Sequence, residues 1–341
     1  MADHTRRPVL GISMGDPNGL GPEVILKCFR DSRMMDQCVP LVFGSALAFE
    51  HYMSLYKWNT YKYKVIEGVN EIDRTCLNII DVCPDFNEMS IGSSNKSGGM
   101  ASWRSLDAAV KTLLANTIDA LVTGPINKHN IQSADFTFPG HTEFLARQAG
   151  QEEALMLLVH QNLRVGMVTG HIPLKDVSSK ITANSIRRKL KMMEKALIED
   201  FGKESPKIAV LGLNPHAGDE GLLGTEEKEL IAPLLAEMQE NGHFFMGPFP
   251  ADGFFGSRNF RNFDGILAMY HDQALAPFKS IAFNRGVNYT AGLPFIRTSP
   301  DHGTGYDIAG RGIASEGSFR EAVFCALDVM RSRKALWQDQ E

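Results

Sequence analysis

The sequence of 341 residues lacks the features that mark secreted, membrane-spanning and nucleic-acid-binding proteins. Its five cysteines are an odd number and include no CxxC pair, so they are expected to be reduced core thiols and not a disulfide framework. No stretch approaches the roughly 20 apolar residues that would span a bilayer. A formal net charge of −5 argues against a nucleic-acid-binding surface.

Several other signals are missing. There is no run of like charges, no low-complexity tract and no internal repeat, and the apolar run near the N-terminus is too short for a signal peptide. We therefore expect a cytoplasmic protein. A glycine-rich turn, residues 15–23, follows the first predicted strand, yet it is neither a Walker loop nor a GxGxxG motif. It is compatible with a tight turn between strand and helix and with a phosphate cradle.

What is present indicates an α/β protein. Hydrophobic residues make up 43% of the chain, enough for one large domain or two. Short apolar runs alternate with amphipathic helices, such as those predicted over 185–201 and from Ser318 onward. This alternation predicts mostly parallel sheets covered by helices on both sides. Between residues 51 and 87 the pattern is weaker, and the alternation over 61–65 suggests an edge strand.

Four of the predicted strands end in polar loops, and histidines stand at the start of three of them. The strands cover 119–122, 164–168, 208–213 and 264–269, and the three histidines are His171, His216 and His271. The carboxyl ends of parallel strands share one edge of a sheet, so loops far apart in sequence can meet there. Three imidazoles with an open position form a catalytic metal site, which is the interpretation that the repeated placement favours.

Each of these histidines taken alone is more simply a hydrogen-bonded loop residue. Two aspartates lie near them in sequence, Asp272 beside His271 and Asp252 in a Pro-Ala-Asp-Gly turn. Either could orient a ligand or accept a proton, although Asp252 also suits an ordinary turn.

Anion-binding side chains are expected in two further places. His141 and Thr142 lie where a loop enters a predicted helix, and the backbone there could hold an anion. Lys279, Asn288 and Arg297 follow the last strand of the set, in a stretch rich in glycine and proline for which we predict irregular backbone. A lysine or arginine in such a stretch could also be a solvated surface charge.

Eight motifs, in order, resemble those of the 4-hydroxythreonine-4-phosphate dehydrogenase (PdxA) family. They are GDPNGLGPE, TGPINK, PGHTEFLA, GHIPL, LNPHAGDEG, ADGFF, YHDQALAPFK and GLPFIRTSPDHGTGYDIAG. The resemblance runs from about residue 8 to residue 324. It implies a fold like that of the isocitrate and isopropylmalate dehydrogenases, with two α/β/α domains and an active site in the cleft between them. The implied domains are 1–133 plus 285–341 on the cofactor side, and 134–284 for metal, substrate and dimerisation.

The resemblance also implies roles for individual residues. The family's metal ligands fall on His171, His216 and His271. Its substrate-binding residues fall on His141, Thr142, Lys279, Asn288 and Arg297, and its adenosine-binding loop on His302, Gly303, Thr304 and Asp307. Asp272 and Asp252 are the candidates for the catalytic base.

The implied activity is oxidation of 4-phosphooxy-L-threonine in vitamin B6 synthesis by a homodimer that shares its active sites. The implied cofactors are NAD or NADP and one divalent metal (Zn, Mg, Mn or Co). Two alternatives stay open: a sibling dehydrogenase acting on a four-carbon sugar-acid phosphate such as threonate or erythronate 4-phosphate, and a non-catalytic protein that binds phosphorylated metabolites on the same scaffold.

Overall fold

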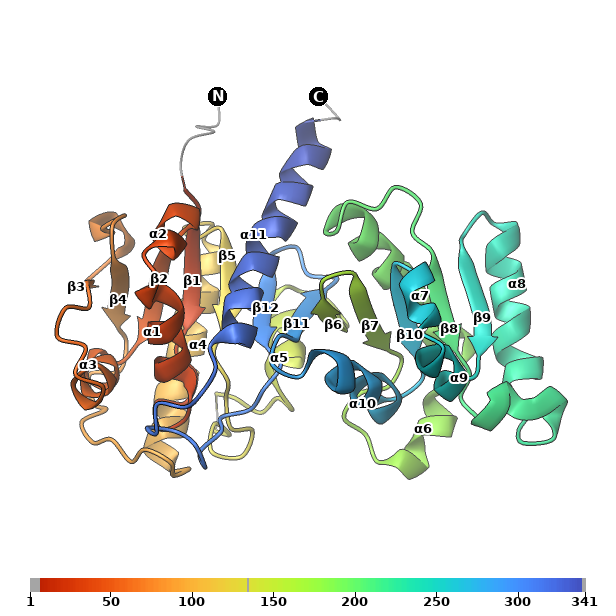
Figure 1. The fold of residues 1–341 in the computed structure, drawn as a ribbon, viewed down its shortest axis with the longest axis horizontal. Helices are drawn as coiled ribbons and strands as arrows, with labels where there is room; N and C mark the ends of the chain where they lie inside the picture. The colour runs from red at the N-terminus through yellow and green to blue at the C-terminus, as the bar shows by residue number, and fades with distance from the viewer. Residues whose placement is uncertain (1–6, 134, 339–341) are drawn as a thin grey trace. The chain divides into compact units, whose positions relative to one another are not determined.

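A computed structural model describes residues 7–133 and 135–338 of the chain, which form two compact α/β units (Figure 1). Unit 1 comprises residues 1–150 and 293–326, and unit 2 comprises residues 151–292 and 327–341. The units therefore divide at 150/151, 292/293 and 326/327, where the family resemblance implied 133/134 and 284/285. Within the described ranges, no helix has the length and apolar character needed to cross a membrane.

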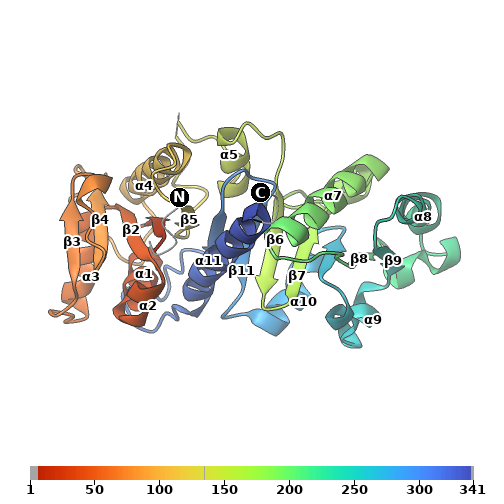
Figure 2. The same cartoon turned by 90° about the horizontal axis from the view of Figure 1, so that it is seen from above.

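Unit 1 holds a parallel sheet with strand order β3-β4-β2-β1-β5-β12. Its strands are β1 (Val9–Ser13), β2 (Val39–Gly44), β3 (Tyr63–Ile66), β4 (Leu77–Asp81), β5 (Ala120–Thr123) and β12 (Arg297–Pro300). Its helices are α1 (Gly21–Arg30), α2 (Arg33–Gln37), α3 (Ala46–Leu55), α4 (Lys96–Leu114), α5 (His141–Gln148) and the first part of α11 (Gly317–Gln338). Figure 2 shows α1 and α2 on one face of this sheet and α4 on the other. The predicted edge strand over 61–65 is confirmed, because β3 forms the outer edge.

Unit 2 has strand order β11-β6-β7-β10-β8-β9. Its strands are β6 (Leu155–His160), β7 (Leu163–Met167), β8 (Ile208–Leu211), β9 (Phe245–Phe249), β10 (Gly265–Ala268) and β11 (Val287–Ala291). The pairs β11–β6 and β6–β7 are antiparallel, whereas β7, β10, β8 and β9 run parallel. The predicted, mostly parallel α/β sheets are therefore confirmed.

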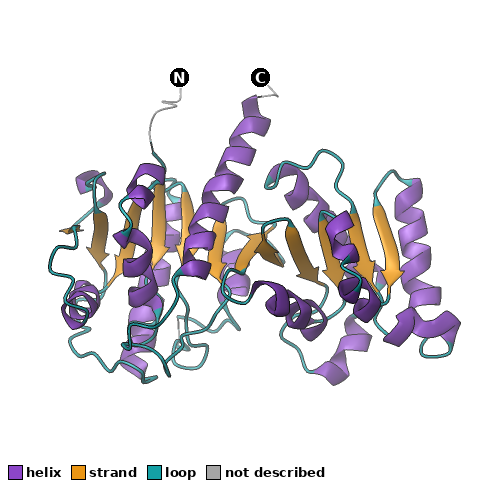
Figure 3. Ribbon diagram, viewed as in Figure 1, coloured by secondary structure: helices purple, strands orange, loops and turns teal. Residues whose placement is uncertain are grey.

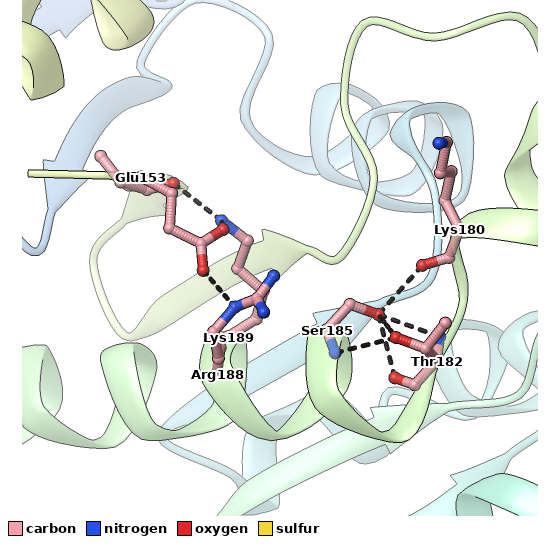
Figure 4. Close-up of polar contacts among 7 residues, drawn as sticks. Glu153, Lys180, Thr182, Ser185, Arg188 and Lys189 are labelled. Carbon is pink, nitrogen blue, oxygen red and sulfur yellow. Dashed lines mark hydrogen bonds and ion pairs between the residues drawn. The ribbon is translucent and has the colours of Figure 1, made fainter.

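Helices cover both faces of the unit 2 sheet, with α7 and α10 on opposite sides in Figure 2. They are α6 (Leu174–Lys180), α7 (Ala183–Glu199), α8 (Ala232–Glu240), α9 (Ala251–Gly256) and α10 (His271–Ala282). Figure 4 shows how α7 begins: the Thr182 hydroxyl accepts from the Ser185 amide, and the Ser185 hydroxyl closes the capping box. Glu153 forms ion pairs with Arg188 and Lys189 on this helix.

A buried ionic group joins α7, β11 and α11 within unit 2. Asp200 is 3% exposed and accepts hydrogen bonds from the Tyr289 hydroxyl (2.6 Å) and from Nε of Arg333 (2.7 Å).

We expect Asp200→Ala to lower the free energy of unfolding by about 3 kcal/mol, because both donors lose their acceptor in a buried place. Urea denaturation measures this. Glu199→Ala, which breaks only the exposed 3.8 Å pair with Lys195, should cost about 0.5 kcal/mol or less. Equal losses in the two variants would contradict the structural role of Asp200.

Candidate active site

The three strand-end histidines follow three neighbouring parallel strands of unit 2. His171 comes four residues after β7, His271 begins α10 directly beyond β10, and His216 lies beyond β8. Because β10 lies between β7 and β8 in the sheet, the three loops start side by side at the same edge. Figure 3 shows these loops and α10 gathered at one end of the strands. The placement proposed from sequence, at one sheet edge, is therefore what the fold produces.

Hydrogen bonds tie the ends of these strands together. The Thr169 amide and hydroxyl both donate to the Met269 carbonyl, at 3.1 and 2.8 Å, and link the His171 loop to the end of β10. Gln273 links β10 to β8: its Oε1 accepts from the Met269 amide at 2.7 Å and its Nε2 donates to the Gly212 carbonyl at 2.6 Å. The backbone under the three histidines is thus held by side chains as well as by the sheet.

Two of the imidazoles are already close together. The ring centroids of His171 and His271 are 5.6 Å apart. Two imidazoles that share one tetrahedral zinc ion, with Zn–N distances of about 2.1 Å, have centroids roughly 5 Å apart. The Nδ1 atom of His271 is 2.6 Å from Oδ1 of Asp272, which leaves the Nε2 side of the ring for a ligand.

The third imidazole does not yet complete this pair. Among residues 7–133 and 135–338, no three His, Cys, Asp or Glu side chains form a group that could hold a metal ion. His171 and His216 are exposed, and exposed side chains change rotamer on the picosecond to nanosecond scale. The donor chemistry and the strand-end placement of the three imidazoles fit a divalent cation.

A cavity of about 440 Å³ lies beside these loops in unit 2. Its lining includes Asn214, His216, Asp252, Tyr270 and Gln273. Asp252, at the start of α9, therefore faces the same cavity as His216, while the Asp272 carboxylate is bonded to His271. The structure separates the two aspartates, giving Asp272 an orienting contact and Asp252 a place at the cavity wall.

The prediction of irregular backbone from 279 to 307 is wrong for its first part. Lys279 lies on α10, Asn288 on β11 and Arg297 at the start of β12. Glycines and prolines separate these elements without breaking them, and the β-branched and aromatic residues of β11 pair with β6. The Asn288 side chain carries a buried Oδ1 that has no hydrogen-bond partner in the described part of the chain.

In unit 1, the basic side chains of Arg297 and His141 lie in one cluster, in which Arg297 is buried and His141 is half-buried. Arg297 is 1% exposed, and its Nη2 and Nε donate to the hydroxyl of Thr123, the last residue of β5, at 2.6 and 3.1 Å. Burial lowers the pKa of Arg297 to about 9, while the charge of Glu143 acts in the opposite direction. Burial, together with the charges of Arg297 and Lys128, holds the pKa of His141 well below its usual range.

These shifts indicate what the cluster can bind. A guanidinium whose pKa is lowered by burial has that pKa raised again when an anion binds beside it. His141 is the first residue of α5 and Thr142 the second, as predicted, so both lie at the positive end of that helix, which favours an anion. The Nε2 atom of His141 is buried and has no hydrogen-bond partner among the described residues. The arrangement suits a phosphate or carboxylate group.

Aromatic packing holds α5 in this position. Phe144, on α5, contacts Trp103 of α4 as well as Phe136 and Phe138, with ring centroids 5.3–5.6 Å apart. Such edge and tilted contacts between aromatic rings add to the energy of burial. The N-terminus of α5 is therefore fixed relative to the sheet that carries Arg297.

The loop 302–307 rests on the glycine-rich turn that follows β1, both within unit 1. The Leu20 amide donates to the Thr304 carbonyl at 2.8 Å, and the Tyr306 hydroxyl donates to Oδ2 of Asp16 at 2.7 Å. Asp16 is fully buried and also accepts from Nδ2 of Asn130 at 2.7 Å. A side chain at Gly303 would meet nothing within 4 Å, so the loop presents backbone to open space there. Asp307 is exposed.

Sequence reasoning missed three residues of these clusters. Lys128 and Thr123 stand on either side of the glycine-proline pair of the TGPINK motif, and Asp16 stands in the GDPNGLGPE motif. Both motifs carry part of the family resemblance, but the sequence gives these three side chains no role. The only signal was their position at or shortly beyond the end of a buried strand, β5 for Thr123 and Lys128 and β1 for Asp16.

Known proteins resemble the chain over nearly its whole length. The profile of the family described as "Pyridoxal phosphate biosynthetic protein PdxA" matches residues 36–326. A relative from Bacteroides thetaiotaomicron, named 4-hydroxythreonine-4-phosphate dehydrogenase, is 46% identical over 326 residues, which cover 95% of this chain and 89% of the relative. A crystal structure of a protein with that name from Klebsiella pneumoniae matches with a TM-score of 0.83 and 32% identity, covering 96% of this chain and 99% of the other. One from Burkholderia phymatum matches with a TM-score of 0.77 and 38% identity, covering 95% and 98%.

Proposed function

The chain belongs to the PdxA family of pyridoxal phosphate biosynthetic proteins, and from this premise we propose that it is an NAD(P)-dependent 4-hydroxythreonine-4-phosphate dehydrogenase. The proposed reaction oxidises 4-phosphooxy-L-threonine to 2-amino-3-oxo-4-phosphooxybutanoate. This 3-oxo acid loses CO2 to give 3-amino-2-oxopropyl phosphate. The observation that carries the proposal is the meeting of three histidine-bearing loops at the ends of β7, β10 and β8, beside a cavity with an acid in its wall.

The residues proposed to hold a divalent cation are His171, His216 and His271. When bound, such a cation supplies Lewis acidity, which lowers the pKa of the substrate's secondary hydroxyl. Neutral imidazoles suit Zn²⁺ and Co²⁺ well, whereas Mg²⁺ and Mn²⁺ prefer oxygen ligands. Asp272 accepts a hydrogen bond from Nδ1 of His271. This contact favours the tautomer in which Nε2 is unprotonated and can bind the metal.

The oxidation removes a hydride from the hydroxyl-bearing carbon and a proton from the hydroxyl. We assign the role of the base that accepts this proton to Asp252. Asp252 lines the cavity, whereas the carboxylate of Asp272 is bonded to His271. The hydride goes to the nicotinamide of NAD or NADP. Loss of CO2 follows from the product itself, since its carboxylate is β to the new carbonyl.

The anionic ends of the substrate are assigned to the side chains already described. Arg297, His141 and Thr142 suit the phosphate or carboxylate by charge and by their place at the start of α5. Lys279 adds a point charge, and Asn288 an amide whose Oδ1 can accept from the substrate amino group. Each such contact restricts the orientation of the group that it binds.

The loop with His302, Gly303, Thr304 and Asp307 is proposed to bind the adenosine part of the cofactor.

We expect Tyr306→Phe to raise the KM for NAD(P) about tenfold with a smaller effect on kcat. The variant loses the hydrogen bond from the Tyr306 hydroxyl to Asp16, and a hydrogen bond to a buried carboxylate is worth roughly 1.5 kcal/mol. Initial rates at varied cofactor concentration measure this. Tyr63→Phe removes a hydroxyl bonded to the exposed Glu50 and serves as the control. An unchanged KM in Tyr306→Phe would show that the Asp16 contact does not support the cofactor loop.

The homodimer with shared active sites and the cytoplasmic location are likewise proposed from family membership. Sedimentation measurements on the purified chain test the first. A monomer with full activity would contradict the shared site.

A substrate comparison tests the proposed activity. The purified protein is given NAD or NADP with 4-phosphooxy-L-threonine, and in parallel with threonate and erythronate 4-phosphates, each with and without EDTA. With 4-phosphooxy-L-threonine we expect reduction of the nicotinamide and release of CO2, both lost with EDTA, and with either sugar-acid phosphate we expect slower reduction. Faster turnover of a sugar-acid phosphate would show that the protein is one of the sibling dehydrogenases instead. Tight binding without reduction of either cofactor would indicate a metabolite-binding protein.

A further inference from the structure

The segment that carries His216 has an unusual backbone. Six successive residues from His216 to Gly221 have positive φ angles, between 43° and 101°, and only two of them are glycine. The left-handed conformation costs an L-residue roughly 1–2 kcal/mol, and glycine alone adopts it freely. Such a run persists only where surrounding contacts enforce it, and strain of this kind is concentrated at functional sites.

A buried carboxylate supplies these contacts. Glu227 is 4% exposed; its Oε1 accepts from the Asn214 amide at 2.7 Å and its Oε2 from the Asn214 side chain at 3.0 Å. The same Asn214 Nδ2 donates to Glu226 at 2.7 Å. Asn214 stands two residues before His216, so its hydrogen bonds to Glu227 fix the entrance to the left-handed turn.

The turn itself lies directly against this carboxylate. A Cβ atom added at Gly218 would come within 2.6 Å of Oε2 of Glu227 and 2.9 Å of the Gly224 carbonyl. Leu223, beyond the turn, donates its amide to the Gly218 carbonyl at 3.0 Å. One buried acid is therefore in contact with the entrance and with the middle of the turn.

We propose that Glu227 is a positioning residue for His216: its carboxylate holds the left-handed turn and thereby sets where the third imidazole stands relative to His171 and His271. The inference rests on the proposed metal-dependent function. It goes beyond that function because Glu227 belongs to neither the metal set nor the substrate set. Replacement of the carboxylate should therefore act on metal binding through His216 and through no other ligand.

Zn²⁺ affinity of the full chain, measured by calorimetric titration, tests this through a double-mutant cycle. Glu227→Gln keeps the size of the side chain but turns one acceptor into a donor that faces Asn214. We expect it to weaken Zn²⁺ binding about 10- to 100-fold, the usual effect of losing a contact that orients a ligand. In a His216→Ala background the same change should have no further effect on affinity. Equal weakening in both backgrounds would show a general structural role and overturn the proposal.

A second pair of variants covers the case in which Glu227→Gln does not fold. Gly218→Ala pushes a methyl group into the carboxylate, whereas Gly242→Ala adds the same methyl at a φ of 89° with nothing within 4 Å. The first should weaken Zn²⁺ binding at least tenfold more than the second, and hydrogen exchange at the Leu223 amide should rise only in the first. Equal behaviour of the two glycine variants would overturn the positioning role.

These outcomes separate the two proposals. Wild-type protein that binds Zn²⁺ while Glu227→Gln binds it equally well overturns the positioning role alone. Wild-type protein that binds neither Zn²⁺ nor Co²⁺ overturns the metal site, and with it the positioning role.

Discussion

His216→Ala will lose turnover by about a thousandfold or more in the presence of a saturating divalent metal, while its thermal midpoint without metal stays close to that of the wild type. The size follows from the several kcal/mol of charge stabilisation that a Lewis acid contributes to hydroxyl ionisation. The fold should survive because the side chain is exposed and the turn is held by Glu227 and Asn214. Steady-state rates with added Zn²⁺, Co²⁺, Mg²⁺ or Mn²⁺ provide the measurement.

His51→Ala is the matched control for this loss. His51 is also exposed but lies on α3 of unit 1 and belongs to none of the proposed metal, substrate or cofactor sets, so its variant should keep wild-type rates. Full activity of His216→Ala after treatment with a chelator would refute the role of the metal and of this ligand together.

Arg297→Lys will lower kcat/KM for the phosphorylated substrate about 100-fold, chiefly by raising KM. A lysine keeps the positive charge but not the planar fork that pairs two nitrogens with two oxygens of an anion. The ammonium group would also lose at least part of the contact that Nε and Nη2 make with Thr123. Kinetics at varied substrate concentration separate KM from kcat.

Two further variants show whether the effect belongs to the buried cluster. Thr123→Val removes the hydroxyl acceptor and should reproduce part of the rise in KM. Arg33→Lys makes the same chemical change at a side chain that is 86% exposed and should leave both constants unchanged. An Arg297→Lys enzyme with wild-type KM would place the substrate anion elsewhere.

Much of the sheet was predictable from local pattern. The runs before His171, His216 and His271 are buried strands. They could be predicted because each is short, apolar and followed by polar residues. The order of these strands was not predictable. The strand before His271 is the last of the three in sequence and yet lies between the other two, and no local pattern encodes that order.

The prediction of irregular backbone at Arg297 was wrong because contacts distant in sequence bury this residue. Arg297 begins a short strand, and its charge and flanking residues favoured a loop. Pairing with β5 and the Thr123 hydroxyl allow the charge to be buried, and neither contact can be inferred from residues near Arg297. The left-handed turn at His216 was equally hidden, because only Gly218 and Gly221 among its six residues signal positive φ.

Anomalous diffraction from crystals grown with Co²⁺ tests the central claim most directly. The account predicts one strong peak at the ends of β7, β10 and β8, with a ring nitrogen of His171, of His216 and of His271 each about 2.1 Å from it. A peak held by other residues, or by only two of these imidazoles with His216 turned away, would contradict it.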